Sequence, residues 1–192
     1  LVISNHATWA NLPFLAFCFH YVYGIPKENI YTMVWPAIFT NEFTYQVARH
    51  FSNLIKTWPL TKNAKTWYPN AWVVSSNAAR KTRSILKSAR LDHPRVFFLA
   101  PSGTTDIVMP DSIQLGTPHV AIPRFMSMIA ERAPIVPIGL NDTNILINGM
   151  PKRGDVFMKI WTATADPGQA LAELPSLVVD GDDKVIGKWN KK

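Results

Sequence analysis

The chain has 192 residues and a formal net charge of +7; 47% of its residues are hydrophobic and 17% are charged. An apolar chain of this length can bury the core of a single domain, which excludes a largely disordered protein. The one cysteine, Cys18, excludes an internal disulfide framework and fits a reducing compartment.

The first third of the chain predicts strands and helices in alternation. Residues 2–4 form a short apolar strand, and because the chain begins inside it, we expect a longer N-terminus to have preceded it. The other elements expected here are a helix over 11–23, a strand over 30–35, a short helix over 41–51, a strand over 53–58 and a polar loop or flap over 61–70.

The rest of the chain continues this alternation. Ser75 and Ser76 are expected to cap a helix that runs to residue 91. Residues 95–100 are a nearly continuous apolar run, which is typical of a central strand buried on both faces. The remaining expected elements are a helix over 118–132, strands over 135–138 and 156–161, and a polar, loosely held C-terminal tail over 177–192.

Strands that alternate with helices predict an α/β fold, with a mostly parallel or mixed central sheet and helices on both faces. We therefore expect one α/β domain over residues 1–176, with its functional site at the carboxyl ends of the strands.

The excess of basic residues is compatible with nucleic acid, a membrane surface or an anionic small substrate. The chain lacks the aromatic motifs of RNA-binding domains and the spacings of zinc sites, so neither a nucleic-acid partner nor a metal is expected. The densest basic group lies on one side of the helix predicted before residue 91 and indicates either a solvated face or a surface for anionic lipid. It comprises Arg80, Lys81, Arg83, Lys87 and Arg90.

No stretch reaches the roughly 18 apolar residues that a membrane span needs. The closest, residues 12–24, contains Pro13 and His20 and predicts a buried or interfacial helix. The expected location is the cytoplasm. There the protein is either free or in peripheral contact with the inner face of an anionic membrane.

Three segments at the ends or starts of predicted strands form an ordered set. They are Asn5-His6 with Asn11, then Pro101-Ser102-Gly103-Thr104-Thr105-Asp106, then Pro134-Ile135-Val136-Pro137. In this order they resemble the blocks of the glycerolipid acyltransferases: NH followed by Asp, a PEGTRS or PSGGRD segment, and a proline-bearing strand. The second block is closer to PSGGRD, the form of the soluble, plastid-type glycerol-3-phosphate acyltransferases, and the resemblance covers residues 2–163.

The resemblance implies that His6 is the general base that takes the proton of an acceptor hydroxyl as the hydroxyl attacks an acyl thioester. Asn11 stands where the family has the Asp that orients the histidine, and it can accept a hydrogen bond but carries no charge. In a serine-protease triad, the same Asp-to-Asn change lowers turnover about 10⁴-fold. Asp106 is the candidate for a substitute acid beside His6.

The resemblance also places substrate binding in the second block. Ser102, Gly103 and Thr104 form a small turn whose amides could hold an oxyanion or a phosphate, and Thr105 stands where the family has a phosphate-binding Arg. Arg49 or Lys56 could meet the phosphate charge instead. No tightly bound cofactor is implied, and acyl-CoA or acyl carrier protein is the expected co-substrate.

Other functions remain open at this point. The two substitutions also fit a catalytically silent relative that binds lipid or acyl carrier, and His6 alone could be a histidine that bonds local backbone. Ser102 lacks the G-x-S-x-G context of a hydrolase nucleophile.

Overall fold

The computed structural model describes residues 1–8, 10–34, 42–56, 71–88, 94–103, 105–118, 120, 122–147 and 150–190. A six-stranded sheet with the order β10-β7-β1-β4-β2-β3 forms its centre. Five strands are parallel, and β10 pairs antiparallel with β7 at one edge. The bounds are β1 Val2–Ser4, β2 Ile30–Val34, β3 Asn53–Lys56, β4 Val96–Leu99, β7 Val136–Asn141 and β10 Phe157–Ile160.

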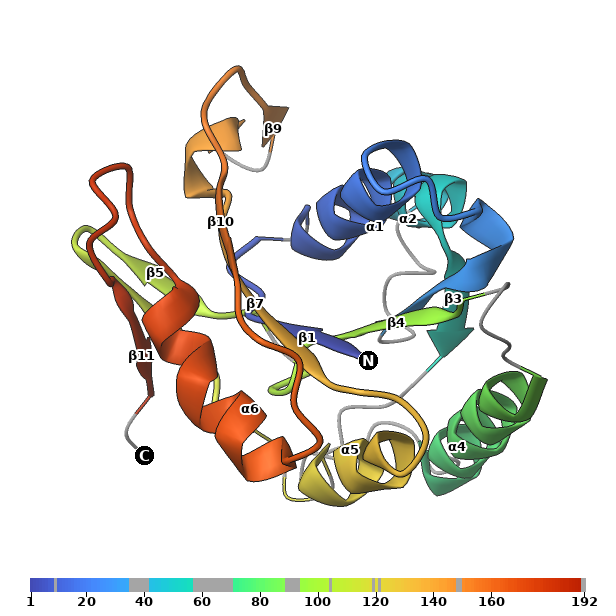
Figure 1. Cartoon of the computed structure of the whole chain (residues 1–192). Coiled ribbons are helices and arrows are strands. Elements are labelled where there is room, and N and C mark those ends of the chain that lie inside the picture. Colours follow the sequence, from blue (N-terminus) through green and yellow to red (C-terminus); the bar gives the residue numbers. More distant parts are fainter. Residues whose placement is uncertain are drawn as a thin grey trace.

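Helices cover both faces of this sheet, as Figure 1 shows, with α1 and α2 on one face and α4, α5 and α6 on the other. Their bounds are α1 Asn11–Tyr21, α2 Glu42–Phe51, α4 Ala71–Ser88, α5 Ile122–Ala130 and α6 Pro167–Glu173. The predicted α/β fold is confirmed.

Alternate residues of the central strands point into two separate cores, because side chains alternate between the faces of a strand. Val2 on β1 belongs to the core beneath α1, with Leu12 and Leu15. Ile3, the next residue, belongs to the opposite core, with Met126 and Ile129 of α5. Burial on both faces explains why these strands are apolar at nearly every position.

Two expectations about helices and loops have different outcomes. Helix α4 begins at Ala71, so Ser75 and Ser76 lie inside the helix and are not its cap. Serine is only mildly unfavourable in a helix interior, so the neighbouring residues determine whether the helix continues through it. The predicted loop or flap over 61–70 lies outside the described residues.

A second sheet, with three strands, was not predicted. Its strand order is β11-β6-β5, and the bounds are β5 Ile107–Met109, β6 Ser112–Leu115 and β11 Gly187–Trp189. Two short strands, β8 Leu146–Ile147 and β9 Met150–Pro151, form a further pair. These strands have two to four residues each, too few for a clear alternating pattern.

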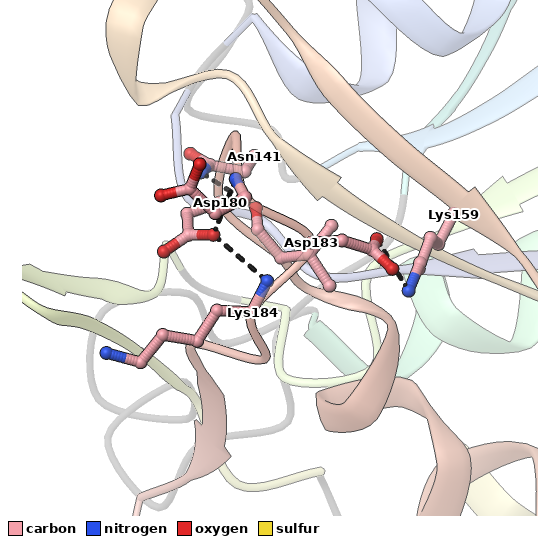
Figure 2. A network of polar contacts seen from close by, with 7 residues as sticks. Asn141, Lys159, Asp180, Asp183 and Lys184 are labelled. Atoms are coloured by element: carbon pink, nitrogen blue, oxygen red, sulfur yellow. Dashed lines mark hydrogen bonds and ion pairs between the residues drawn. The ribbon is translucent and has the colours of Figure 1, made fainter.

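The expectation that residues beyond 177 are loosely held is wrong. Val178 is fully buried, and β11 pairs with β6. A Cβ atom added to Gly139 on β7 would lie 2.1 Å from the Leu177 carbonyl oxygen, so only glycine lets this segment pack so closely. Figure 2 shows the polar contacts that add to this packing, among them an Asn141 side chain that donates to the Val179 carbonyl at 3.0 Å.

Candidate functional site

Three strands that are far apart in the sequence end together at one edge of the central sheet. Ile3 of β1 pairs with Leu99 of β4 on one side and with Pro137 of β7 on the other. Because all three strands are parallel, the residues that follow them meet at the carboxyl edge, where ligands bind in open α/β sheets. These segments contain His6, Asp106 and Asp142.

Asn5 continues the pairing of β1 with β7 through its side chain. Its Nδ2 donates to the Leu140 carbonyl at 2.8 Å, and its Oδ1 accepts from the Leu140 N–H at 2.7 Å. The side chain is buried and both halves of the amide are satisfied. Asn5 therefore anchors the chain at the point where it turns away from the sheet, one residue before His6.

Asp106 holds the backbone of His6 from the other side. Its Oδ2 accepts from the His6 N–H at 2.6 Å, and its own N–H donates to the His6 carbonyl at 2.7 Å. Its Oδ1 accepts from the Gly116 N–H at 2.9 Å. Burial raises the pKa of Asp106, and these N–H donors offset part of the rise. The predicted closeness of Asp106 to His6 is confirmed, but the contact is to the main chain and not to the imidazole.

His6 as a residue is partly exposed, and one of its ring nitrogens, Nδ1, is buried and has no hydrogen-bond partner among the described residues. Burial lowers the pKa of His6 to about 4, although the Thr8 backbone and the Asn11 side chain lie near enough to raise it in part. At neutral pH the ring is therefore uncharged, which is the form that accepts a proton. With Nδ1 buried, Nε2 is the nitrogen left to meet a substrate.

Asn11, the expected orienter of the histidine, is fully buried at the start of α1. Its Oδ1 accepts from the Thr8 N–H at 2.7 Å, while its Nδ2 has no partner among the described residues. The bond from Thr8 is local and shapes the turn between His6 and α1. Since His6 Nδ1 has no hydrogen-bond partner among the described residues, the ring does not bond Asn11 directly.

Asp142 is a fully buried acid at this edge that the sequence analysis did not identify. It follows β7, and its Oδ2 accepts from the Thr8 hydroxyl at 2.5 Å, whereas its Oδ1 is buried and has no partner in the part of the chain that the structure describes. Burial raises the pKa of Asp142 to about 6, and the negative charge of Asp106 adds to the rise. The sequence signal was the polar pair Asn141-Asp142 directly after an apolar strand.

The turn after β4 lies at the same edge, but one of its amides is already used. Gly103 adopts a φ of 66°, and its N–H donates to the Ala100 carbonyl at 3.0 Å, so this amide is not available to an oxyanion. Ser102 is partly exposed, and Thr105 is exposed beside Asp106. Thr104 lies outside the described residues.

The two cations proposed for phosphate binding are not brought to His6. Arg49 lies in the last turn of α2, just before β3 begins, so it lies at the amino-terminal edge of the sheet, opposite the site. Its guanidinium lies 5.9 Å from the centre of the Tyr45 ring. Lys56 ends β3 at the correct edge, but β4 and β2 separate β3 from β1, a span of about 14 Å.

The described residues contain no group of three or more His, Cys, Asp or Glu side chains that could hold a metal ion. No model of a known protein family matches this sequence, and no curated protein matches it either. Fold and site define an α/β protein with a backbone-anchored histidine at the carboxyl edge of its sheet.

Proposed function

We propose that the protein is an acyltransferase that moves a fatty acyl group from acyl-CoA or acyl carrier protein to a hydroxyl of glycerol-3-phosphate or a lysophospholipid, a step of glycerolipid synthesis. The observation that carries the proposal is the placement of His6. Its backbone N–H and C=O are both bonded to Asp106, its ring is uncharged at neutral pH, and the residue is partly exposed at the carboxyl edge of the sheet, where ligands bind in open α/β folds.

The chemistry uses His6 twice. Nε2 takes the proton of the acceptor hydroxyl while the hydroxyl oxygen attacks the thioester carbonyl. The C–S bond then breaks, and the leaving thiolate receives the proton from the imidazolium. The acyl group ends as an ester, the thiol is released, and His6 returns to its neutral form. In this proposal the acceptor is bound beside Thr105, which is exposed next to Asp106.

The second candidate is a relative that binds lipid or acyl carrier without turnover. It is favoured by the unpaired Nδ1 and the low pKa of His6, because a base with a pKa of about 4 is weak and its imidazolium is poorly stabilised.

Membrane contact at the cytoplasmic face is part of the proposal. In the part of the chain that the structure describes, no helix combines the length and the apolar character needed to cross a bilayer. Large side chains on α1 and α2 are nevertheless exposed: Phe17 at 40%, Tyr21 at 60% and Phe43 at 60%. Aromatic side chains of this kind favour the membrane interface. Flotation with anionic vesicles tests the contact, and loss of binding in Phe43→Asp is expected.

The activity is tested by offering acyl-CoA and acyl carrier protein donors with glycerol-3-phosphate, lysophosphatidate and unphosphorylated acceptors, and detecting product by mass spectrometry. Product that disappears in His6→Ala supports the acyltransferase. His50→Ala is the matched control, because His50 is exposed at the far edge of the sheet. Product from Asn11→Asp alone, with none from the unaltered protein, would favour the silent relative with a lost orienter. No product from either protein would contradict the proposed activity.

A further inference from the structure

Around the turn between His6 and α1, three buried polar atoms have no hydrogen-bond partner among the residues that the structure describes. They are His6 Nδ1, Asn11 Nδ2 and Asp142 Oδ1. Buried polar atoms are nearly always paired, because an unpaired one costs about 1–3 kcal/mol. Two of these atoms are donors, since Nδ1 carries the proton in the tautomer that leaves Nε2 free, and the carboxylate oxygen is an acceptor.

Thr8 connects the three groups. Its N–H donates to Asn11 Oδ1 at 2.7 Å, and its hydroxyl donates to Asp142 Oδ2 at 2.5 Å. Its backbone also lies close enough to His6 to affect the ring. The carboxyl end of β7 is thus joined to the segment that carries the histidine.

We infer that Asp142 is a positioning residue that supplies, through Thr8 and Asn11, the negative charge that a general-base histidine needs. The inference rests on the proposed function of His6. When Nε2 accepts a proton, Nδ1–H donates to the free lone pair of Asn11 Oδ1, and Asn11 Nδ2 donates to Asp142 Oδ1. No proton passes to Asp142, which stabilises the imidazolium by its charge.

The charges around Asp142 support this role. From the β4 side it faces Asp106, another carboxylate, and among the described residues neither acid has an ion pair with a lysine or arginine. A buried carboxylate without a cation is costly. Of the titratable groups described in this cluster, His6 is the one that can become positive, and it does so only during the reaction.

The test is a pH titration of the His6 ring, monitored by ¹⁵N NMR. It is carried out on the unaltered protein, on Asp142→Asn and on the control Asp155→Asn, whose carboxylate is exposed. Asp142 ionises near pH 6, above the pKa of about 4 of His6, so its charge is expected to appear as a step in the His6 ring shifts near pH 6, and Asp142→Asn should remove that step. Asp155→Asn should leave the step in place. Thr8→Val, which breaks the connection but keeps the acid, should also alter the titration. An unchanged His6 titration in Asp142→Asn would overturn the inference, because a merely structural role would move stability and not the ring.

Activity gives a separate measure. We expect kcat to fall about 10–100-fold in Asp142→Asn with KM nearly constant, and Asn11→Asp to restore part of it in the double variant. If the unaltered protein makes no product, the proposed function fails, while the NMR titration still decides whether Asp142 acts on His6. Unchanged kcat in Asp142→Asn would overturn the inference even for an active enzyme.

Discussion

Replacement of Asp142 by Asn should make the protein more stable at neutral pH, although it removes a hydrogen-bonded side chain. Asp142 is fully buried, its Oδ1 has no partner among the described residues, and its Oδ2 accepts a hydrogen bond from the Thr8 hydroxyl. An asparagine has nearly the same shape and can still accept that bond. The change therefore removes the charge and little else.

The expected gain follows from the pKa. Burial raises the pKa of Asp142 from 3.8 to about 6, so the folded protein holds this proton more tightly than the unfolded chain does. Ionisation therefore costs stability progressively as the pH rises through this interval, up to about 3 kcal/mol at roughly 1.4 kcal/mol per pH unit. Asp142→Asn does not ionise, so it should gain about 2–3 kcal/mol over the unaltered protein at pH 7.5 and only about 0.5 kcal/mol at pH 4.

Urea denaturation of both proteins at pH 4 and pH 7.5 measures this difference. Asp155→Asn is the control for removal of an exposed charge, and its effect should stay within about 0.5 kcal/mol at both pH values. A loss of stability in Asp142→Asn at pH 7.5, or a gain that is equal at both pH values, would refute the assignment of a buried ionised carboxylate. A more stable protein with a lower kcat would mark Asp142 as a charge retained for function.

Three further predictions concern the groups that build the site. Because burial lowers the pKa of His6 from 6.5 to about 4, the stability of the protein should fall as the pH drops through this interval. His6→Gln should remove a pH dependence of about 2 kcal/mol, less than the full difference since the residue is partly exposed; identical pH curves for the two proteins would contradict the buried Nδ1. Asp106→Ala leaves the His6 and Gly116 N–H groups unpaired. We expect the free energy of unfolding, measured with urea, to fall by about 3 kcal/mol and product formation to be lost. A stable, active variant would exclude the anchoring role of Asp106. Gly139→Ala places a Cβ atom 2.1 Å from the Leu177 carbonyl oxygen and should cost about 2 kcal/mol or more, whereas unchanged thermal unfolding would show that the C-terminal segment does not pack on β7.

Two of the confirmed elements, β2 and β4, have an apolar pattern that is long enough to identify from the sequence alone. The runs that became β2 and β4 are buried on both faces, so nearly every residue is apolar and the strand is recognisable alone. Helix α6 was missed although its start was readable, because Asp166 caps it by accepting from the Gly168 N–H at 2.8 Å and Pro167 follows as the first helical residue. The strands β5, β6 and β11 stabilise one another across the chain and have no comparable local signal.

The sequence by itself determined that this is an α/β chain, that His6 follows its first strand, and that the segment before Asp106 follows a central strand. Local patterns suffice for these conclusions, because burial and turn chemistry act over a few residues. Only the tertiary structure decided that Asp106 grips the backbone of His6, that Asp142 bonds Thr8, and that Arg49 lies at the opposite edge. Those contacts depend on the order of the strands in the sheet, which brings the ends of β1, β4 and β7 together across 135 residues of sequence separation. No spacing along the chain encodes which strand ends become neighbours.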